Sequence, residues 1–115
     1  HDPSLVLDAF LLRSLAIAGW APSFSVCARC GEEGPHRWFS ISGGGALCDR
    51  CKVAGSTAPS PLTLHLLGAL LSGDWDAVRE TEPRNRREAS GIVAAQVQWH
   101  LERNLKSLPL VDRTG

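Results

Sequence analysis

The chain has 115 residues, 43% hydrophobic and 21% charged, and its 12 basic side chains are balanced by 12 acidic ones. This length and composition indicate one folded domain rather than a disordered chain. The balanced charge argues against a surface that binds nucleic acid over its whole area, and no apolar run approaches the ~20 residues of a membrane-spanning helix.

The first predicted element is a helix over residues 3–18. Asp2 is its expected N-cap, Pro3 suits the first helical position, and Gly19 is a typical C-terminal stop. Apolar residues cover more than one face of this helix. The pattern therefore predicts burial on several sides, either in the centre of a bundle or against a neighbouring domain.

Residues 25–55 have a different composition, rich in Cys, Gly and charged residues. Short extended stretches at 37–41 and 46–47 are separated by three consecutive glycines, Gly43 to Gly45, which predicts a β-hairpin with a tight turn. The following run 56–61 is rich in Ser and Pro and predicts a linker.

A second helix is expected after this linker. Ser60 is its predicted cap, Pro61 its first residue and Gly73 the residue past its end. Leucines recur along it at intervals of three and four, which predicts a stripe that faces the core. The predicted stripe consists of Leu62, Leu66, Leu67, Leu70 and Leu71.

Two more helices complete the expected fold. Asp74 caps a short one over 75–80, and the longest runs over 85–107 and ends before Pro109. The core positions of the longest helix follow an i+4 ladder with three neighbours beside it: Ala89, Val93, Val97, Leu101 and Leu105, with Ile92, Gln96 and Trp99. Because Leu and Ala outnumber Val and Ile, the predicted class is mainly α, a helical domain with a small zinc-binding hairpin inserted.

The four cysteines form two C-x₂-C pairs. Each pair can direct two thiolates to one metal ion, and a spacer of about 15–20 residues lets a hairpin return the second pair to the first. The pattern predicts one structural Zn²⁺ per chain, which supplies folding energy because four sulfur ligands leave no open position for a reaction. The expected ligands are Cys27, Cys30, Cys48 and Cys51.

The cysteine pattern leaves other interpretations open. Two disulfides, a thiol-redox pair or an iron–sulfur cluster use the same residue type, although no signal peptide points to an oxidising compartment. His36, within the spacer, can in principle replace one cysteine. Three basic residues lie in or beside the pairs and either offset the charge of a thiolate site or face a phosphate backbone. They are Arg29, Arg50 and Lys52.

No catalytic constellation is visible, because no phosphate-binding loop and no nucleophile with its base can be identified. Charge is nevertheless uneven, with an acidic stretch over 72–82 and basic residues along 84–106. The basic residues predict a site for DNA or an acidic peptide, or else pair with the acidic stretch. They are Arg84, Arg86, Arg87, Arg103 and Lys106.

Tryptophans offer a second kind of contact, since indole rings can stack on nucleic-acid bases. The positions of Trp20, Trp75 and Trp99 favour packing in or near the core. Trp38, beside Phe39 in the expected hairpin, is the better candidate for an exposed contact, unless this pair pads the zinc module against the helices.

Three segments together resemble the C-terminal part of the RecO family of bacterial recombination mediators, in its actinobacterial form. They are Gly19-Trp20-Ala21-Pro22 leading into Cys27-Ala28-Arg29-Cys30-Gly31, Leu47-Cys48-Asp49-Arg50-Cys51, and the ending from Trp99 to Leu110. The resemblance covers essentially the whole chain. Because many zinc modules share the cysteine pattern, the order of helix, cysteine pairs, Leu-rich helix and ending makes the resemblance specific.

The resemblance implies a fold of two parts, an N-terminal oligonucleotide-binding barrel and a helical, zinc-bearing half. Residues 1–115 would be this C-terminal half, with the zinc insertion at about 25–55 and the barrel absent. Since the chain starts at His1 rather than Met, we expect a domain cut from a longer protein.

The resemblance also implies a non-catalytic role in DNA repair and recombination. The expected activities are binding of single- and double-stranded DNA, strand annealing and loading of the recombinase on coated single strands. The expected partners are the acidic C-terminal tail of single-stranded DNA-binding protein and RecR, in the bacterial cytoplasm at the nucleoid and without a membrane. The tail would enter an apolar groove between helices, rimmed by Arg84, Arg87 or Arg103.

Two other classes of function stay open. One is a zinc-stapled scaffold for protein interaction with no DNA role of its own. The other is a zinc-dependent or thiol-redox enzyme.

Overall fold

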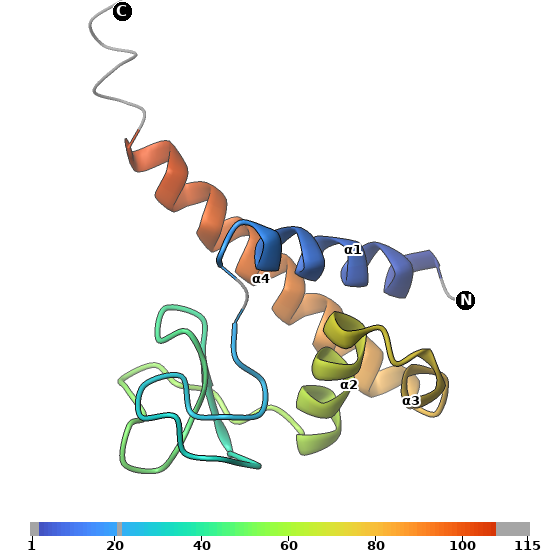
Figure 1. Ribbon diagram of the computed structural model, residues 1–115, viewed down its shortest axis with the longest axis horizontal. Coiled ribbons are helices and arrows are strands. Elements are labelled where there is room, and N and C mark those ends of the chain that lie inside the picture. Colours follow the sequence, from blue (N-terminus) through green and yellow to red (C-terminus); the bar gives the residue numbers. More distant parts are fainter. Residues whose placement is uncertain (1–2, 21, 108–115) are drawn as a thin grey trace, which may run out of the picture.

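Helices α1 (Pro3–Ile17), α2 (Pro61–Ser72), α3 (Trp75–Arg79) and α4 (Pro83–Ser107) surround one core, and the strands β1 (Trp38–Ser40) and β2 (Gly45–Leu47) lie between α1 and α2 in the chain. The structure is a computed structural model that describes residues 3–20 and 22–107, with side chains to residue 104. In Figure 1 the helices form one lobe, and β1, β2 and their loops form a second. The predicted fold class is confirmed.

Helix α1 ends as its sequence predicts. Gly19 has a φ of 82°, and the N–H groups of Gly19 and Trp20 donate to the carbonyls of Ala16 (3.0 Å) and Leu15 (2.7 Å). This pair of bonds is the Schellman motif, which glycine favours because it lacks a Cβ. The expected N-cap, Asp2, lies outside the described residues.

The caps of α2 and α3 are also confirmed. The Ser60 hydroxyl accepts from the Leu62 N–H, Pro61 begins α2, and Gly73 ends it in the left-handed conformation. The Asp74 carboxylate accepts from the Ala77 N–H at the start of α3. Helix α4 begins two residues earlier than predicted, at Pro83, because proline is well suited to a first helical turn. Pro109, the expected terminator, lies outside the described residues.

The buried face of α2 differs from the predicted leucine stripe. Leu66, Leu67 and Leu70 are buried, but Leu62 is 54% exposed and Leu71 is only half-buried. Because α2 packs against α1, α3 and α4, a wider face than a single stripe is covered. Its remaining buried residues are Thr63, Leu64 and Ala69.

The predicted ladder of α4 is buried only along its first half. Ala89, Val93 and Gln96 are buried, whereas Leu101 is 54% exposed. Figure 1 shows the reason, since the C-terminal part of α4 extends past the crossing with α1. The side chain of Leu105 lies outside the described part.

Helix α1 is buried on one side only within the described chain, so it does not lie in the centre of a bundle; burial of its other side against a neighbouring domain stays a prediction. Its buried residues recur at helical spacing and are Leu5, Asp8, Ala9, Leu12 and Leu15. The Asp8 carboxylate accepts a hydrogen bond from the Ser90 hydroxyl of α4. The other side exposes Phe10 (65%) and Ile17 (89%). Among the described helices none has the length and hydropathy to cross a membrane.

Candidate metal centre

The predicted hairpin is present and positions the second cysteine pair. Strands β1 and β2 are antiparallel, with Trp38 opposite Leu47 and Ser40 opposite Gly45. Gly45 has a φ of 127°, and a Cβ at this position would lie 2.2 Å from the Ser23 carbonyl oxygen. Only glycine fits there, because the segment before the first cysteine pair lies directly against β2, where the Ala46 N–H donates to the Ser23 carbonyl (2.8 Å). This backbone pairing brings the first cysteine pair beside the second.

Part of the predicted linker over residues 56–61 is hydrogen-bonded to the hairpin. Thr57 donates to the Phe39 carbonyl (2.9 Å) and accepts from the Phe39 N–H (2.8 Å), so it pairs with the free edge of β1. The chain therefore enters α2 from a fixed position beside the hairpin.

Each C-x₂-C pair is a tight turn held by its own backbone. In the first turn the Gly31 N–H donates to the Cys27 carbonyl (2.9 Å), and in the second the Cys51 N–H donates to the Cys48 carbonyl (3.1 Å). The Ala28 N–H donates to the Ala46 carbonyl (2.8 Å), which fastens the first turn to β2. The two turns therefore face each other across the end of the hairpin.

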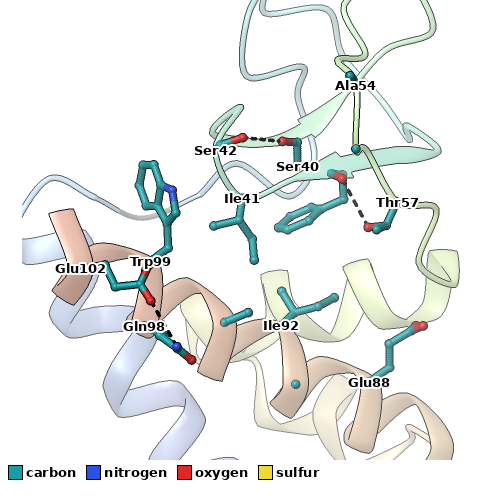
Figure 2. Close-up of a pocket in the computed structure, with 14 residues that line it drawn as sticks. Ser40, Ile41, Ser42, Ala54, Thr57, Glu88, Ile92, Gln98, Trp99 and Glu102 are labelled. Carbon is teal, nitrogen blue, oxygen red and sulfur yellow. Dashed lines mark hydrogen bonds between the residues drawn. The ribbon is translucent and has the colours of Figure 1, made fainter.

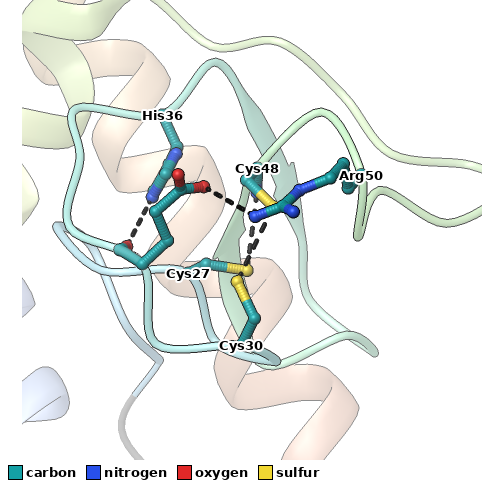
Figure 3. A network of polar contacts seen from close by, with 6 residues as sticks. Cys27, Cys30, His36, Cys48 and Arg50 are labelled. Atoms are coloured by element: carbon teal, nitrogen blue, oxygen red, sulfur yellow. Dashed lines mark hydrogen bonds and ion pairs between the residues drawn. The ribbon is translucent and has the colours of Figure 1, made fainter.

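All four sulfur atoms lie within 4.8 Å of one another. The Sγ atoms of Cys30 and Cys48 are 3.8 Å apart (Figure 3), and the Cys48 N–H points at Cys27 Sγ (3.5 Å). All four thiols are free, and no disulfide joins them. The two pairs predict this proximity, and the group could hold one metal ion. Metal binding by these residues stays a prediction.

The thiol cluster has its own small hydrophobic core. Cys27 (2% exposed), Cys48 (5%) and Leu47 (0%) are buried together, with Trp38 and Val53 packed around them. This core is separate from the helical one. Cys30 is exposed and Cys51 is half-buried, so one side of the cluster faces solvent.

The thiols differ strongly in acidity. The Cys30 backbone N–H, which hydrogen-bonds to Cys27, is the main cause that lowers the pKa of Cys27 to about 5. The hydrogen bond to Cys48, followed by burial, raises the pKa of Cys51 to about 12. Because nearby thiolates repel one another, the cluster without a cation does not lose all its protons at neutral pH.

Arg50 is the basic residue that faces the sulfurs. Its guanidinium lies 3.8 Å from the Glu32 carboxylate, and Figure 3 shows it reaching over the cluster. Attraction to Glu32, and then to Cys48, raises the pKa of Arg50 further. Arg29 and Lys52 are exposed, and Lys52 Nζ lies over the Trp38 ring at 4.4 Å. Arg50 can thus offset the negative charge of thiolates.

The remaining residues of the spacer have structural contacts. His36 Nε2 lies 2.7 Å from the Glu32 carbonyl and does not belong to the thiol group. The Trp38 indole N–H donates to Asp49 (2.7 Å), and Phe39 is buried in the helical core, where it stacks on Phe24 at 6.0 Å. This geometry agrees with the padding role for the Trp38–Phe39 pair.

The basic residues predicted at the start of α4 make local contacts. Arg84 pairs with Glu82 at 3.1 Å, and the Arg86 Nε–H donates to the Thr81 hydroxyl at 3.1 Å. Arg87 is exposed. The interpretation in which these residues pair with the acidic stretch therefore holds for Arg84.

Arg103 lies elsewhere, in a cluster that the sequence did not reveal. It is 17 positions beyond Arg86, about 25 Å along the helix axis. Its guanidinium stacks over Trp99 (4.7 Å) and Trp20 (5.7 Å). Trp20 is 38% exposed, at the surface rather than in the core, while Trp75 packs against the helical core as expected. The side chain of Lys106 lies outside the described part.

The structure therefore does not bring the predicted basic residues into one site. Within the described residues, the groove between the hairpin and α4 and the groove beside α2 are lined by none of Arg84, Arg86, Arg87 and Arg103. The signal that could have revealed the Arg103 cluster is the Trp20 motif and the ending around Trp99, which the sequence analysis treated separately.

Comparison with known proteins gives a consistent family assignment. The family model described as "Recombination protein O C terminal" matches residues 1–109. The DNA repair proteins RecO of Streptomyces avermitilis and Streptomyces coelicolor are each 58% identical over 113 residues, and that of Nocardioides sp. is 59% identical over 116 residues. These matches cover 98% of the chain but only 46% to 48% of the relatives, so the chain spans about half their length. No solved structure gives a significant match.

Proposed function

This chain belongs to the recombination protein O (RecO) C-terminal family, and from that premise we propose that it is the C-terminal half of a DNA repair and recombination mediator. The family match over residues 1–109 is the observation that carries this proposal. Residues 1–115 form one unit with the cysteine module at about 25–55, and an oligonucleotide-binding barrel occupies the remaining half of the whole protein.

The unit holds one Zn²⁺ through Cys27, Cys30, Cys48 and Cys51. The four sulfurs already lie within 4.8 Å of one another, and thiolates are the ligands that structural zinc prefers. When bound, zinc supplies the folding energy that a small cysteine-rich module cannot draw from its own core. The basic side chain of Arg50 moderates the charge of the site, and the role of the module is structural.

The unit has no catalytic activity and contributes by binding. In the whole protein, acting at the bacterial nucleoid, it supports binding of single- and double-stranded DNA, strand annealing and recombinase loading. RecR is contacted mainly through the barrel. What supports this assignment is the name shared by the relatives, DNA repair protein RecO.

Arg103 is the best-supported contact for the acidic tail of single-stranded DNA-binding protein. Among the described residues it has no carboxylate partner, whereas Arg84 is paired with Glu82. Its guanidinium lies near both indole rings, 4.7 Å from Trp99 and 5.7 Å from Trp20, so its position is restrained while its N–H groups can donate to a carboxylate. The tail's apolar anchor then lies against exposed Trp20.

Titration of the zinc-loaded chain with a synthetic tail peptide tests this assignment. We expect measurable binding that Arg103→Ala weakens by about tenfold and that Arg84→Ala, the matched control, leaves unchanged. Absence of binding at near-millimolar peptide would contradict the tail contact.

The alternative function is an interaction scaffold with no DNA role. Fluorescence anisotropy of labelled single- and double-stranded oligonucleotides distinguishes it from the proposed DNA repair function. No change at roughly 100 μM protein, the weak end of non-specific DNA binding, would favour the scaffold.

A further inference from the structure

A groove of about 630 Å³ lies between the hairpin module and α4 (Figure 2). One wall is a single face of α4, from Glu88 to Glu102 at helical spacing, and the other consists of residues 39–42 and 54–57. The α4 wall spans about 21 Å, or four helical turns. The groove is therefore long and straight, as a docking site for a helix requires.

The floor of the groove is apolar and open. Ile41, Ile92 and Ala95 line it, and each is only partly buried. Gly91 also lines it, and no atom lies within 4 Å of the position that a Cβ would occupy there. Glycine within a helix lowers its stability relative to alanine, yet no contact in the described chain requires it. Gly91 thus keeps space free in the middle of the floor.

The charges at the groove are all negative. Glu88 and Glu102 stand at the two ends of the α4 wall, and no basic residue lines the groove. Glu88 accepts from the Ser60 N–H (3.1 Å) and Glu102 from the Gln98 side chain (3.2 Å), and neither carboxylate has an ion pair among the described residues. This charge repels both DNA and an acidic peptide.

Among the described residues, no arginine of α4 forms an ion pair with these carboxylates. Arg84 is engaged by Glu82, and Arg103 is stacked on Trp99. Neither lines the groove.

We propose that this groove binds a basic amphipathic helix of a partner protein. The apolar side of that helix packs on Ile41, Ile92 and Ala95, its backbone passes close to Gly91, and Lys or Arg residues at its two ends pair with Glu88 and Glu102. The inference is independent of the proposed DNA repair function, because it depends on charge complementarity and groove shape alone.

Two synthetic peptides of about 14 residues, the length of the α4 wall, test the proposal by calorimetry with the zinc-loaded chain. Both carry leucines at helical spacing, and their flanking residues are lysine in one and glutamate in the other. We expect the lysine peptide to bind about tenfold more tightly or better.

Variants of the chain locate the binding. Gly91→Leu fills the floor with a better helix former, so we expect unchanged or higher helicity and about a tenfold loss of affinity for the lysine peptide. The double variant Glu88→Lys/Glu102→Lys should lose the preference for the lysine peptide. Glu80→Lys, an exposed carboxylate outside the groove, is the matched control and should change little.

Several results would overturn the proposal. They are equal affinity for the two peptides, no binding at near-millimolar peptide, or an affinity that Gly91→Leu leaves unchanged. A chain that dimerises in sedimentation and becomes monomeric as Gly91→Leu would show that a second copy fills the groove. A lysine peptide that binds this chain but not a longer form with the other half of the protein would show that the groove is covered internally.

Discussion

The sulfur atoms of Cys30 and Cys48 lie 3.8 Å apart although the whole hairpin separates the two residues in the chain. Four sulfurs arranged tetrahedrally about 2.3 Å from a zinc ion have edges of about 3.8 Å. The folded backbone therefore sets these two sulfurs at the spacing of two zinc ligands.

Purified chain should contain about one zinc ion per molecule, since the four sulfurs form a single group. Elemental analysis combined with thiol titration checks this expectation. Chelation should disorder the cysteine module but leave most of the helical circular dichroism, because among the described buried residues of the helical core only Phe39 comes from the hairpin. Metal-free chain without reactive thiols would point to disulfides, and loss of all helicity on chelation would show that the two cores are not separable.

Cys51→Ser should weaken zinc binding by about a hundredfold or more, since a hydroxyl is a poor replacement for a thiolate ligand. His36→Ala is the matched control within the same module, because the His36 ring contacts the Glu32 carbonyl rather than the thiols. Competition with a chromophoric chelator measures both affinities. A large loss in His36→Ala with little change in Cys51→Ser would place the histidine in the ligand set.

Zinc affinity should rise with pH. A metal ion competes with protons for the sulfurs, and the Cys51 thiol, with its pKa raised to about 12, is protonated at neutral pH and must release its proton on binding. Cys27, with its pKa lowered to about 5, is already a thiolate there, so the affinity falls more steeply once the pH drops below that value. Competition titrations between roughly pH 4 and 8 measure the trend. A flat profile would contradict it.

Gly45→Ala should destabilise the chain by about 3 kcal/mol or more, because it combines a left-handed backbone with a steric clash. The new Cβ would lie 2.2 Å from the Ser23 carbonyl oxygen. Gly55→Ala is a matched control, since its φ is also positive (85°) but nothing lies within 4 Å. Gly55→Ala should lower the free energy of unfolding by only about 1 kcal/mol, and denaturant unfolding measures both variants. Equal losses would mean that the segment around Ser23 moves freely to accommodate the methyl group.

Local signals were sufficient to predict most of the fold. Ser60, Asp74 and Gly73 act within one helical turn of their own positions, and each C-x₂-C pair is a turn of its own. The cysteine cluster was predictable for the same reason, because its spacing encodes both turns and the hairpin between them.

Contacts between distant segments were not predictable from the sequence. Which leucines of α2 are buried depends on the three helices around it, and the exposure of Leu62 follows from that packing. Arg103 meets Trp20 only because α4 crosses the end of α1, so this contact could not be predicted. The distance of Arg103 from Arg84 and Arg86, in contrast, was already implied by their positions along one predicted helix. The groove along α4 likewise requires the hairpin module to stand beside the helix.

Strand β1 places neighbouring side chains in different lobes. Trp38 packs on the thiol cluster, whereas Phe39, the next residue, lies in the helical core. Because consecutive side chains of a strand point in opposite directions, one short segment belongs to both lobes at once. The pairing of Phe39 with Thr57 braces this segment from its other edge. The connection between the two lobes is thus rigid rather than flexible. A partner bound to the helical lobe and a partner bound to the hairpin lobe would therefore keep a constant angle to each other.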